Sequence, residues 1–327
     1  MGWKGTVRAI QADMRRAARE ADRKQKIQAK LKAMDDAQSA VRAFENYIEG
    51  ITSIHTDCNS EIMDWQDTAS QRPPSEPKRS NDSEAEAKRK HDGFKPRLLN
   101  KLLRNEAKKR EKLKQAIIAA TTKDEEKYQD RLTEYRNKYA LWEKKKNLAE
   151  RLLNKDPQAF IDTIRELNPF TSIEKLGSGL QFTVDDRGNL TASISVHSDE
   201  VIPKEKYSLR QSGTLSTKEM PKGEFNTLYQ DYVCSCILRV AAELYALLPI
   251  ERVLINAKDN LLNPKTGHIE EQTIVSVMVM RKTFEALNLN NIDPSDAMKN
   301  FLHNMRFKKT SGFDVVEPVT YEEVEAA

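Results

Sequence analysis

Apolar residues near the start of the chain recur at alternating steps of three and four positions. They form a seam that contains Met34, Ala37, Val41, Phe44, Ile48 and Ile51. This spacing is typical of one face of a coiled-coil helix. The first proline is Pro73, and Gly50 is the only glycine between Thr6 and His55. The pattern therefore predicts a first long coiled-coil helix within residues 1–65.

A stretch rich in proline and serine interrupts this pattern. Residues 66–95 contain three prolines among Ser, Gln, Asp and Arg, which predicts a flexible linker. Residues 96–168 are expected to form a second long helix, basic at its start, and then a short helix. Its seam again steps by four and three, through Tyr128, Leu132, Tyr135, Tyr139, Trp142, Lys146, Ala149 and Leu153. Two such seams favour an antiparallel helical hairpin, and self-association of this coiled-coil arm fits them equally well.

The pattern changes from helical to β after Asn168. Apolar and polar residues alternate over residues 180–184 and again over residues 190–196, with Asp, Arg, Gly and Asn between the two runs. This arrangement predicts a β-hairpin with one buried face. A third strand is expected at residues 206–210.

The remainder of the chain carries the most apolar segments. Residues 223–248 predict a helix that is apolar around most of its circumference, which is typical of a central, buried element. Residues 252–257 and 273–280 predict two neighbouring buried strands. The fold class predicted for residues 169–322 is α+β with a mostly antiparallel sheet, and residues 323–327 form an acidic tail.

Charge is distributed unevenly along the chain. The formal net charge is +4, but residues 1–168 carry +9 and residues 169–327 carry −5. Residues 88–114 alone hold twelve Lys and Arg against three carboxylates. Such a concentration suits contact with nucleic-acid phosphates or with an acidic protein. The residues expected to make this contact are Lys101, Arg104, Lys108, Lys109, Arg110 and Lys112.

Two other interpretations of residues 88–114 stay open. A solvated helical face is the more common origin of such charge, and no base-reading module accompanies this one. Leu98, Leu99, Leu102 and Leu103 also allow a membrane-surface helix, although they cover only two turns.

Composition excludes several classes of protein. Three cysteines cannot staple a disulfide scaffold, and the sequence has no run of 18 apolar residues that could span a bilayer. The first segment is charged and lacks the apolar region of a secretory signal. We therefore expect a cytoplasmic protein with reduced thiols, and no membrane partner.

The sequence contains no pattern that implies a cofactor or a metal site. Cys234 and Cys236 lie two positions apart in a predicted helix, so they face nearly opposite sides and cannot share a metal ion. His55 and Cys58 have no third ligand nearby. Arg239 and Glu243, one helical turn apart, predict a structural ion pair at the helix rim or, less commonly, a buried functional pair.

Polar residues between the two late strands are the best enzymatic candidates. Asp259, His268 and Glu270 lie in a predicted loop over residues 258–270, where a carboxylate beside Lys258 would suit a metal-dependent nuclease. The pattern is incomplete, because Asn256 occupies the position of a required carboxylate. A structured turn accounts for the same residues.

The sequence favours a non-enzymatic interaction or scaffold protein. In this hypothesis the basic coiled-coil arm contacts nucleic acid or an acidic partner, and the α+β domain docks a protein partner. The alternative is a metal-dependent nuclease or other hydrolase, with its site in the C-terminal domain, delivered by the basic arm. A purely structural coiled-coil scaffold without nucleic-acid contact is a third hypothesis.

Overall fold

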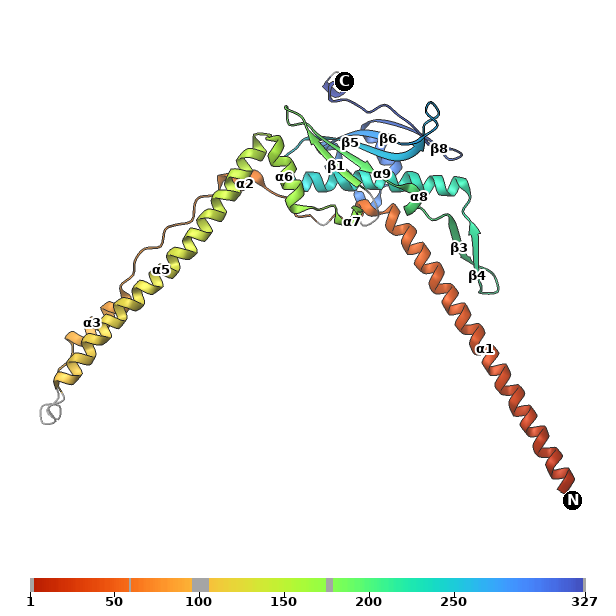
Figure 1. Ribbon diagram of the computed structural model, residues 1–327, viewed down its shortest axis with the longest axis horizontal. Coiled ribbons are helices and arrows are strands. Elements are labelled where there is room, and N and C mark those ends of the chain that lie inside the picture. Colours follow the sequence, from red (N-terminus) through yellow and green to blue (C-terminus); the bar gives the residue numbers. More distant parts are fainter. Residues whose placement is uncertain (1–2, 59, 96–105, 175–178, 326–327) are drawn as a thin grey trace. The chain divides into compact units, whose positions relative to one another are not determined.

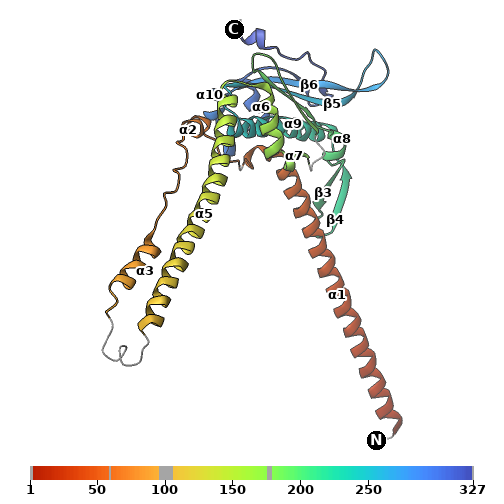
Figure 2. The ribbon, with the colours of Figure 1, turned by 60° about the vertical axis from the view of Figure 1, so that its left-hand side comes forward.

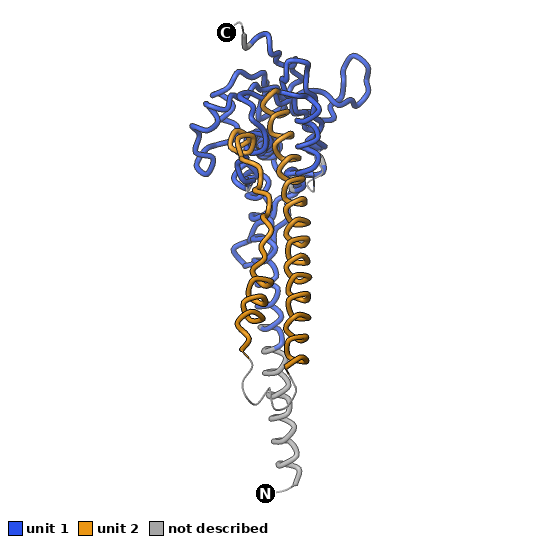
Figure 3. The backbone as a smooth tube through the Cα atoms, turned by 90° about the vertical axis from the view of Figure 1, so that its left-hand side faces the viewer, with its two compact units in different colours: residues 1–63, 155–327 blue, residues 64–154 orange. Residues whose placement is uncertain are grey.

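The computed structural model describes residues 3–58, 60–95, 106–174 and 179–325. The chain divides into two units, each with its own internal packing (Figure 3). Unit 1 comprises residues 1–63 and 155–327, and unit 2 comprises residues 64–154.

Unit 1 contains a six-stranded mixed sheet with the strand order β1-β2-β5-β6-β7-β8. Only the β2–β5 pair is parallel, and the other neighbours are antiparallel. The α+β class and the mostly antiparallel sheet are thus as predicted. The strands are β1 (Gly179–Val184), β2 (Leu190–Ser195), β5 (Arg252–Leu262), β6 (Ile269–Met280), β7 (Leu302–Lys308) and β8 (Gly312–Asp314).

Helix α9 (Lys222–Leu247) forms the centre of unit 1 (Figure 1). Every residue from Tyr232 to Leu247 is buried, as expected for a helix that is apolar on most sides. The sheet packs on one side of α9, and helix η1 (Ile54–Thr56) and the end of helix α1 (Trp3–Thr52) pack elsewhere on its surface.

The C-terminal segment contributes to a second, smaller cluster. Leu254 and Met278, paired across β5 and β6, pack with Val319, and Tyr321 covers them. The backbone N–H of Val319 donates to Ser276 Oγ (2.8 Å), which holds this segment against β6. Asp259, on the opposite face of β5 from Leu254, contacts Tyr229 of α9 instead. Both faces of the central strands are therefore covered.

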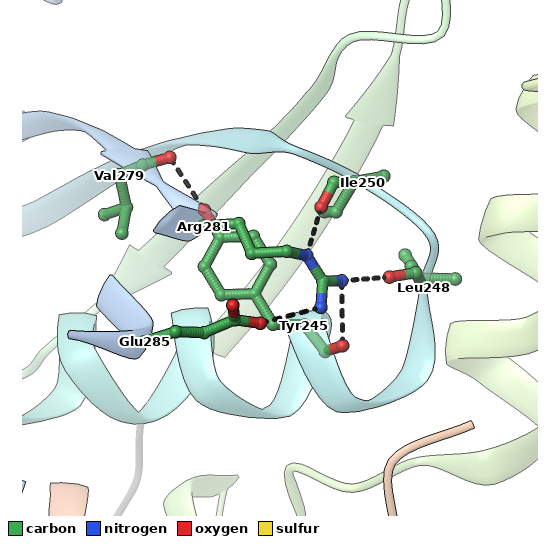
Figure 4. A network of polar contacts seen from close by, with 6 residues as sticks. All are labelled: Tyr245, Leu248, Ile250, Val279, Arg281 and Glu285. Atoms are coloured by element: carbon green, nitrogen blue, oxygen red, sulfur yellow. Dashed lines mark hydrogen bonds and ion pairs between the residues drawn. The ribbon is translucent and has the colours of Figure 1, made fainter. Parts of the chain in front are cut away.

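Arg281 secures the end of α9 (Figure 4). Its Nη2 donates to the carbonyl oxygens of Tyr245 (2.9 Å) and Leu248 (2.7 Å), and its Nε donates to that of Ile250 (2.7 Å). The guanidinium also lies 4.8 Å from the centroid of the Tyr245 ring. A cation at a helix C-terminus satisfies carbonyls that have no partner within the helix.

The seam of α1 is covered by a separate two-stranded sheet, β3 (Glu205–Leu209) and β4 (Leu215–Glu219). Phe44 and Tyr207 have ring centroids 5.5 Å apart. Gly213, in the β3–β4 turn, has φ of +77°, and a Cβ there would lie 2.4 Å from the Cε of Met34. Leu31, one turn before Met34, is 60% exposed. Coverage of the seam thus begins at Met34.

Unit 2 consists of helices α2 (Trp65–Ser70), α3 (Asp82–Asp92) and α5 (Glu106–Leu153). Helices α2 and α3 both contact α5. Trp142 Nε1 donates to the carbonyl oxygen of Gln71 (3.0 Å), and the Arg79 guanidinium lies 5.1 Å from the centroid of the Tyr128 ring. The seam predicted on the second long helix is its least exposed stripe.

Several expectations differ from this arrangement. A coiled-coil hairpin between the two long helices is not confirmed, since the β3–β4 hairpin covers the seam of α1 and residues 65–92 lie along that of α5. The stretch expected to be a flexible linker contains α2 and α3. The third predicted strand exists as β3, but it pairs with β4 outside the main sheet.

Short elements complete the fold, and none of the described helices is long and apolar enough to cross a membrane. The remaining elements are α6 (Pro157–Leu167), α7 (Thr171–Glu174), α8 (Ser198–Val201), α10 (Arg281–Glu285), η2 (Leu289–Asn291), α11 (Pro294–Ala297), η3 (Met298–Asn300) and α12 (Tyr321–Glu325).

Candidate functional site

The basic residues singled out in the sequence begin helix α5. Lys108, Lys109, Arg110 and Lys112 lie in its first two turns, and all four side chains are exposed. Arg110 Nη2 lies 3.2 Å from Glu106 Oε1 one turn earlier. Lys101 and Arg104, the other two predicted contacts, lie outside the described residues.

Helix α3 runs antiparallel to α5 within unit 2 (Figure 2). The backbone N–H of Glu84, in the first turn of α3, donates to Asp124 Oδ2 (2.9 Å). Hydrogen bonds from the Ser83 side chain and the Glu84 backbone hold the pKa of Asp124 below its ordinary value. Asp124 thus fixes the start of α3 to the middle of α5, so the end of α3 lies towards the start of α5.

This packing brings two basic stretches together. Residues 88–95 and 106–114, which we call the basic tip, hold nine Lys and Arg against three carboxylates. Two of the nine make exposed pairs within α3, Lys88 with Glu84 (2.5 Å) and Lys90 with Glu86 (2.6 Å). Exposed pairs of this kind contribute only about 0–1 kcal/mol each, so they exchange readily for other anions.

The candidate enzymatic loop is largely strand. Residues predicted as loop belong to β5 and β6, which pair as far as Leu262 and Ile269. Asp259 is 5% exposed and accepts hydrogen bonds from Ser198 Oγ (2.5 Å), the Tyr229 hydroxyl and the Asn260 backbone N–H (2.8 Å). Its carboxylate joins β5 to α8 and α9, which is a structural position.

Glu270 is the second residue of β6, and His268 lies in the turn before it. Glu270 accepts hydrogen bonds from Asn263 Nδ2 (2.8 Å) and Thr266 Oγ1 (2.5 Å), and these bonds lower its pKa. His268 is exposed, and its backbone carbonyl accepts from the Asn263 N–H (2.8 Å). No group of three or more His, Cys, Asp and Glu among the described residues is arranged to hold a metal ion.

Arg239 and Glu243 form an ion pair in the middle of α9. Arg239 Nη2 lies 2.7 Å from Glu243 Oε1, and the two side chains are 7% and 1% exposed. The pair is therefore buried rather than at the helix rim. Arg239 Nη1 donates to the carbonyl oxygen of Ile54 (3.3 Å), and the Ser60 hydroxyl donates to Glu243. These contacts join the segment after α1 to α9.

A second polar contact lies beside this pair. The backbone N–H of His55 donates to Ser235 Oγ (3.1 Å), and the same oxygen lies 2.8 Å from His55 Nδ1. Burial lowers the pKa of His55, so its ring is neutral near pH 7. Burial and Glu243 raise the pKa of the Cys58 thiol, which therefore stays protonated and is not an activated nucleophile.

A pocket of about 300 Å³ opens next to the pair. It is lined by Tyr47, Ile51, Asp57 and Arg239, among others. Arg239 Nε has no hydrogen-bond partner, but both ends of its guanidinium are engaged by Glu243 and Ile54. The pocket thus adjoins a neutralised charge pair.

Cys234 and Cys236 are fully buried. Burial raises the pKa of both thiols, and their position in α9 agrees with core packing rather than metal binding.

Asp231 lies about one turn before Cys234 in α9, and the sequence analysis did not identify it. Burial raises its pKa to about 6, and the charge of Asp293 adds to the shift. Asp293 caps α11 by accepting from the backbone N–H groups of Ser295 (2.9 Å) and Asp296 (3.0 Å). The two carboxylates are 62 positions apart in the sequence, so no local pattern indicates that they lie close together.

No protein-family model matches this chain, and no curated protein or solved structure matches it.

The buried ion pair yields a first prediction. Arg239→Met leaves the Glu243 carboxylate buried without its cation, and we expect the free energy of unfolding to fall by about 3–5 kcal/mol. The double variant Arg239→Met/Glu243→Leu removes both charges and should recover most of that loss. Chemical denaturation of the two variants checks this. A double variant as unstable as the single one would contradict the account.

Asp231 yields a prediction about pH. Its pKa is raised from 3.8 to about 6, so the folded state binds an extra proton between these values, and stability falls as the pH rises through them. Asp231→Asn should therefore increase the free energy of unfolding at pH 7, on the order of 1 kcal/mol because the group is only half-buried. The gain should disappear below about pH 4, and equal gains at both pH values would refute this origin.

Proposed function

We propose that this chain is a non-enzymatic interaction protein whose basic tip contacts the phosphates of nucleic acid. The observation that supports the proposal is the antiparallel packing of α3 and α5, which directs the basic end of α3 towards the basic start of α5. Each phosphate contact releases condensed counterions, so a cluster of such contacts binds strongly at low salt.

The interactions inside the tip agree with this role. Lys88, Lys90 and Arg110 each contact a carboxylate on their own helix, and such exposed pairs hold the side chains only weakly. A backbone phosphate carries the same single negative charge as a carboxylate and is an equally good acceptor for these cations.

The non-enzymatic part of the proposal has separate support. Asp259 and Glu270, the two candidate carboxylates, are both engaged in hydrogen bonds that hold the β5–β6 hairpin and its contact with α9. A cytoplasmic setting with reduced thiols also belongs to the proposal, and Cys58, Cys234 and Cys236 are free thiols. Docking of a protein partner by the α+β domain stays a prediction.

The test removes charge from the tip and compares an equal loss elsewhere on the same helix. The tip variant is Lys108→Gln/Lys109→Gln/Lys112→Gln, and the control is Lys123→Gln/Lys144→Gln/Lys145→Gln, also exposed positions of α5. Glutamine and lysine have similar helix propensities, so the helix is retained. Binding to a labelled duplex and to single strands is measured by fluorescence anisotropy between about 50 and 200 mM salt.

The tip variant should bind more weakly, and its slope of log K against log salt should be smaller by about 3, roughly 0.9 for each lost contact. The control should keep the native slope. Equal effects of the two variants would overturn the proposal, as would absence of binding by the native protein. Strand cleavage in the same samples with Mg²⁺ would overturn its non-enzymatic part.

A further inference from the structure

Helix α1 divides into two parts of opposite charge. Residues 34–52 contact the β3–β4 hairpin and α9, and they carry a net charge of −3. Residues 3–33 precede the covered part of the seam and carry +7. The side chains described between Gln25 and Ala33 are all exposed, Lys30 among them. The net positive charge of α1 thus lies in the part before residues 34–52.

The basic residues of this part share one side of the helix. A helix turns by about 100° per residue, and eight of the ten basic positions fall within a sector of roughly 120°. Lys24 and Lys32 fall outside it, and Asp22 is the only acidic position inside it. We call the eight positions the basic stripe: Lys4, Arg8, Arg15, Arg16, Arg19, Arg23, Lys26 and Lys30.

Like charges follow one another along the stripe at one-turn spacing. Arg15, Arg19 and Arg23 are four positions apart, as are Lys26 and Lys30. Each such pair destabilises a helix by a few tenths of a kcal/mol, on the order of 0.2–0.5. Farther along α5 the same spacing joins opposite charges, for example Glu134 with Lys138 (2.6 Å). A stripe that repels itself is stabilised by a partner of opposite charge.

The dimensions of the stripe fit a linear polyanion. From Lys4 to Lys30 it extends for roughly 39 Å at about 1.5 Å per residue, and a duplex presents one negative charge per about 1.7 Å of its axis. Five of its eight residues are arginines, whose planar guanidinium binds phosphate through two donors.

The opposite side of the helix argues against a membrane. It carries large apolar residues only at its start, at Trp3, Val7, Ile10 and Met14. Beyond Met14 the same side holds Ala17 and Ala21 together with Glu20, Lys24, Gln28 and Lys32. A helix that lies in a membrane surface needs a continuous apolar face with large side chains. Here that face is limited to residues 3–14, whereas the basic stripe continues to Lys30.

We propose that residues 3–33 of α1 form a second nucleic-acid contact, in which the basic stripe lies along the phosphates of a duplex. The proposal extends the function proposed above to a surface in the other unit, and either surface can bind without the other.

Two lysine pairs on the same few turns provide a matched test in the full-length protein. Lys26→Gln/Lys30→Gln removes two charges from the stripe, and Lys24→Gln/Lys32→Gln removes two charges beside it. Both variants have the same net charge and the same side-chain chemistry. A third variant, Arg8→Gln/Arg15→Gln/Arg19→Gln/Arg23→Gln, removes the centre of the stripe. Binding to a duplex DNA and a duplex RNA of about two helical turns is measured across the same salt series.

The stripe pair should reduce the slope of log K against log salt by about 2 and the arginine variant by about 3–4, while the off-stripe pair leaves it unchanged. Equal effects of the two lysine pairs would overturn the proposal, because net charge alone would then explain binding. Unchanged duplex binding by the arginine variant would also overturn the proposal. This holds even if that variant binds anionic vesicles or acidic peptides more weakly.

The tip variant of α5, measured beside these, separates the two proposals. If it weakens binding while the stripe variants do not, the function proposed above stands and the stripe is not a contact. If only the stripe variants weaken binding, the stripe is the contact and the tip is not. Circular dichroism of every variant checks that helix content is retained.

Discussion

The complete burial of α9 from Tyr232 to Leu247 is the constraint on which the rest of unit 1 depends. A helix enclosed on all sides cannot leave a charge unpaired, because an uncompensated buried charge costs several kcal/mol. Arg239 and Glu243 neutralise each other, and each makes one further hydrogen bond, to the Ile54 carbonyl oxygen and from the Ser60 hydroxyl. The contacts that compensate the buried charges of α9 therefore also hold the segment after α1 against α9.

These contacts determine which part of α1 packs against the rest of unit 1. The end of α1 is held by α9 and by the β3–β4 hairpin, and its apolar seam is covered as far back as Met34. In unit 2, the apolar seam of α5 is covered by α2, α3 and the stretch between them. The described side chains that lie beyond this cover, within residues 25–33 of α1 and 106–114 of α5, are mostly exposed and carry a net positive charge, and both proposed contacts include them.

Local patterns predicted most of the elements. The β1–β2 hairpin, the apolar helix α9, the two late strands and both seams follow from periodicity that each element carries in its own residues. The seams illustrate the limit of such reasoning. Spacing of three and four identifies which side of a helix is covered, but a β-hairpin or an extended segment covers that side as well as a second helix does.

Contacts between residues that lie far apart in the sequence could not be predicted from local patterns. Asp259 is polar and follows an apolar run, so it resembled the start of a loop, whereas in the structure Tyr229 and Ser198 satisfy it inside the sheet. The raised pKa of Asp231 depends on Asp293, and the setting of Arg239 depends on Ile54. The strand β7 was missed, since its alternating residues are mostly polar.

Hydrogen exchange along α1, in the protein free of nucleic acid, tests the central claim most directly. The account predicts slow exchange for amides of residues 34–52 and for the His55 and Met63 amides, which donate to Ser235 and to the Ala246 carbonyl. It predicts much faster exchange for residues 3–33, with the change near Met34. Equal protection on both sides of Met34 would contradict it, because another surface would then cover the basic part of the helix.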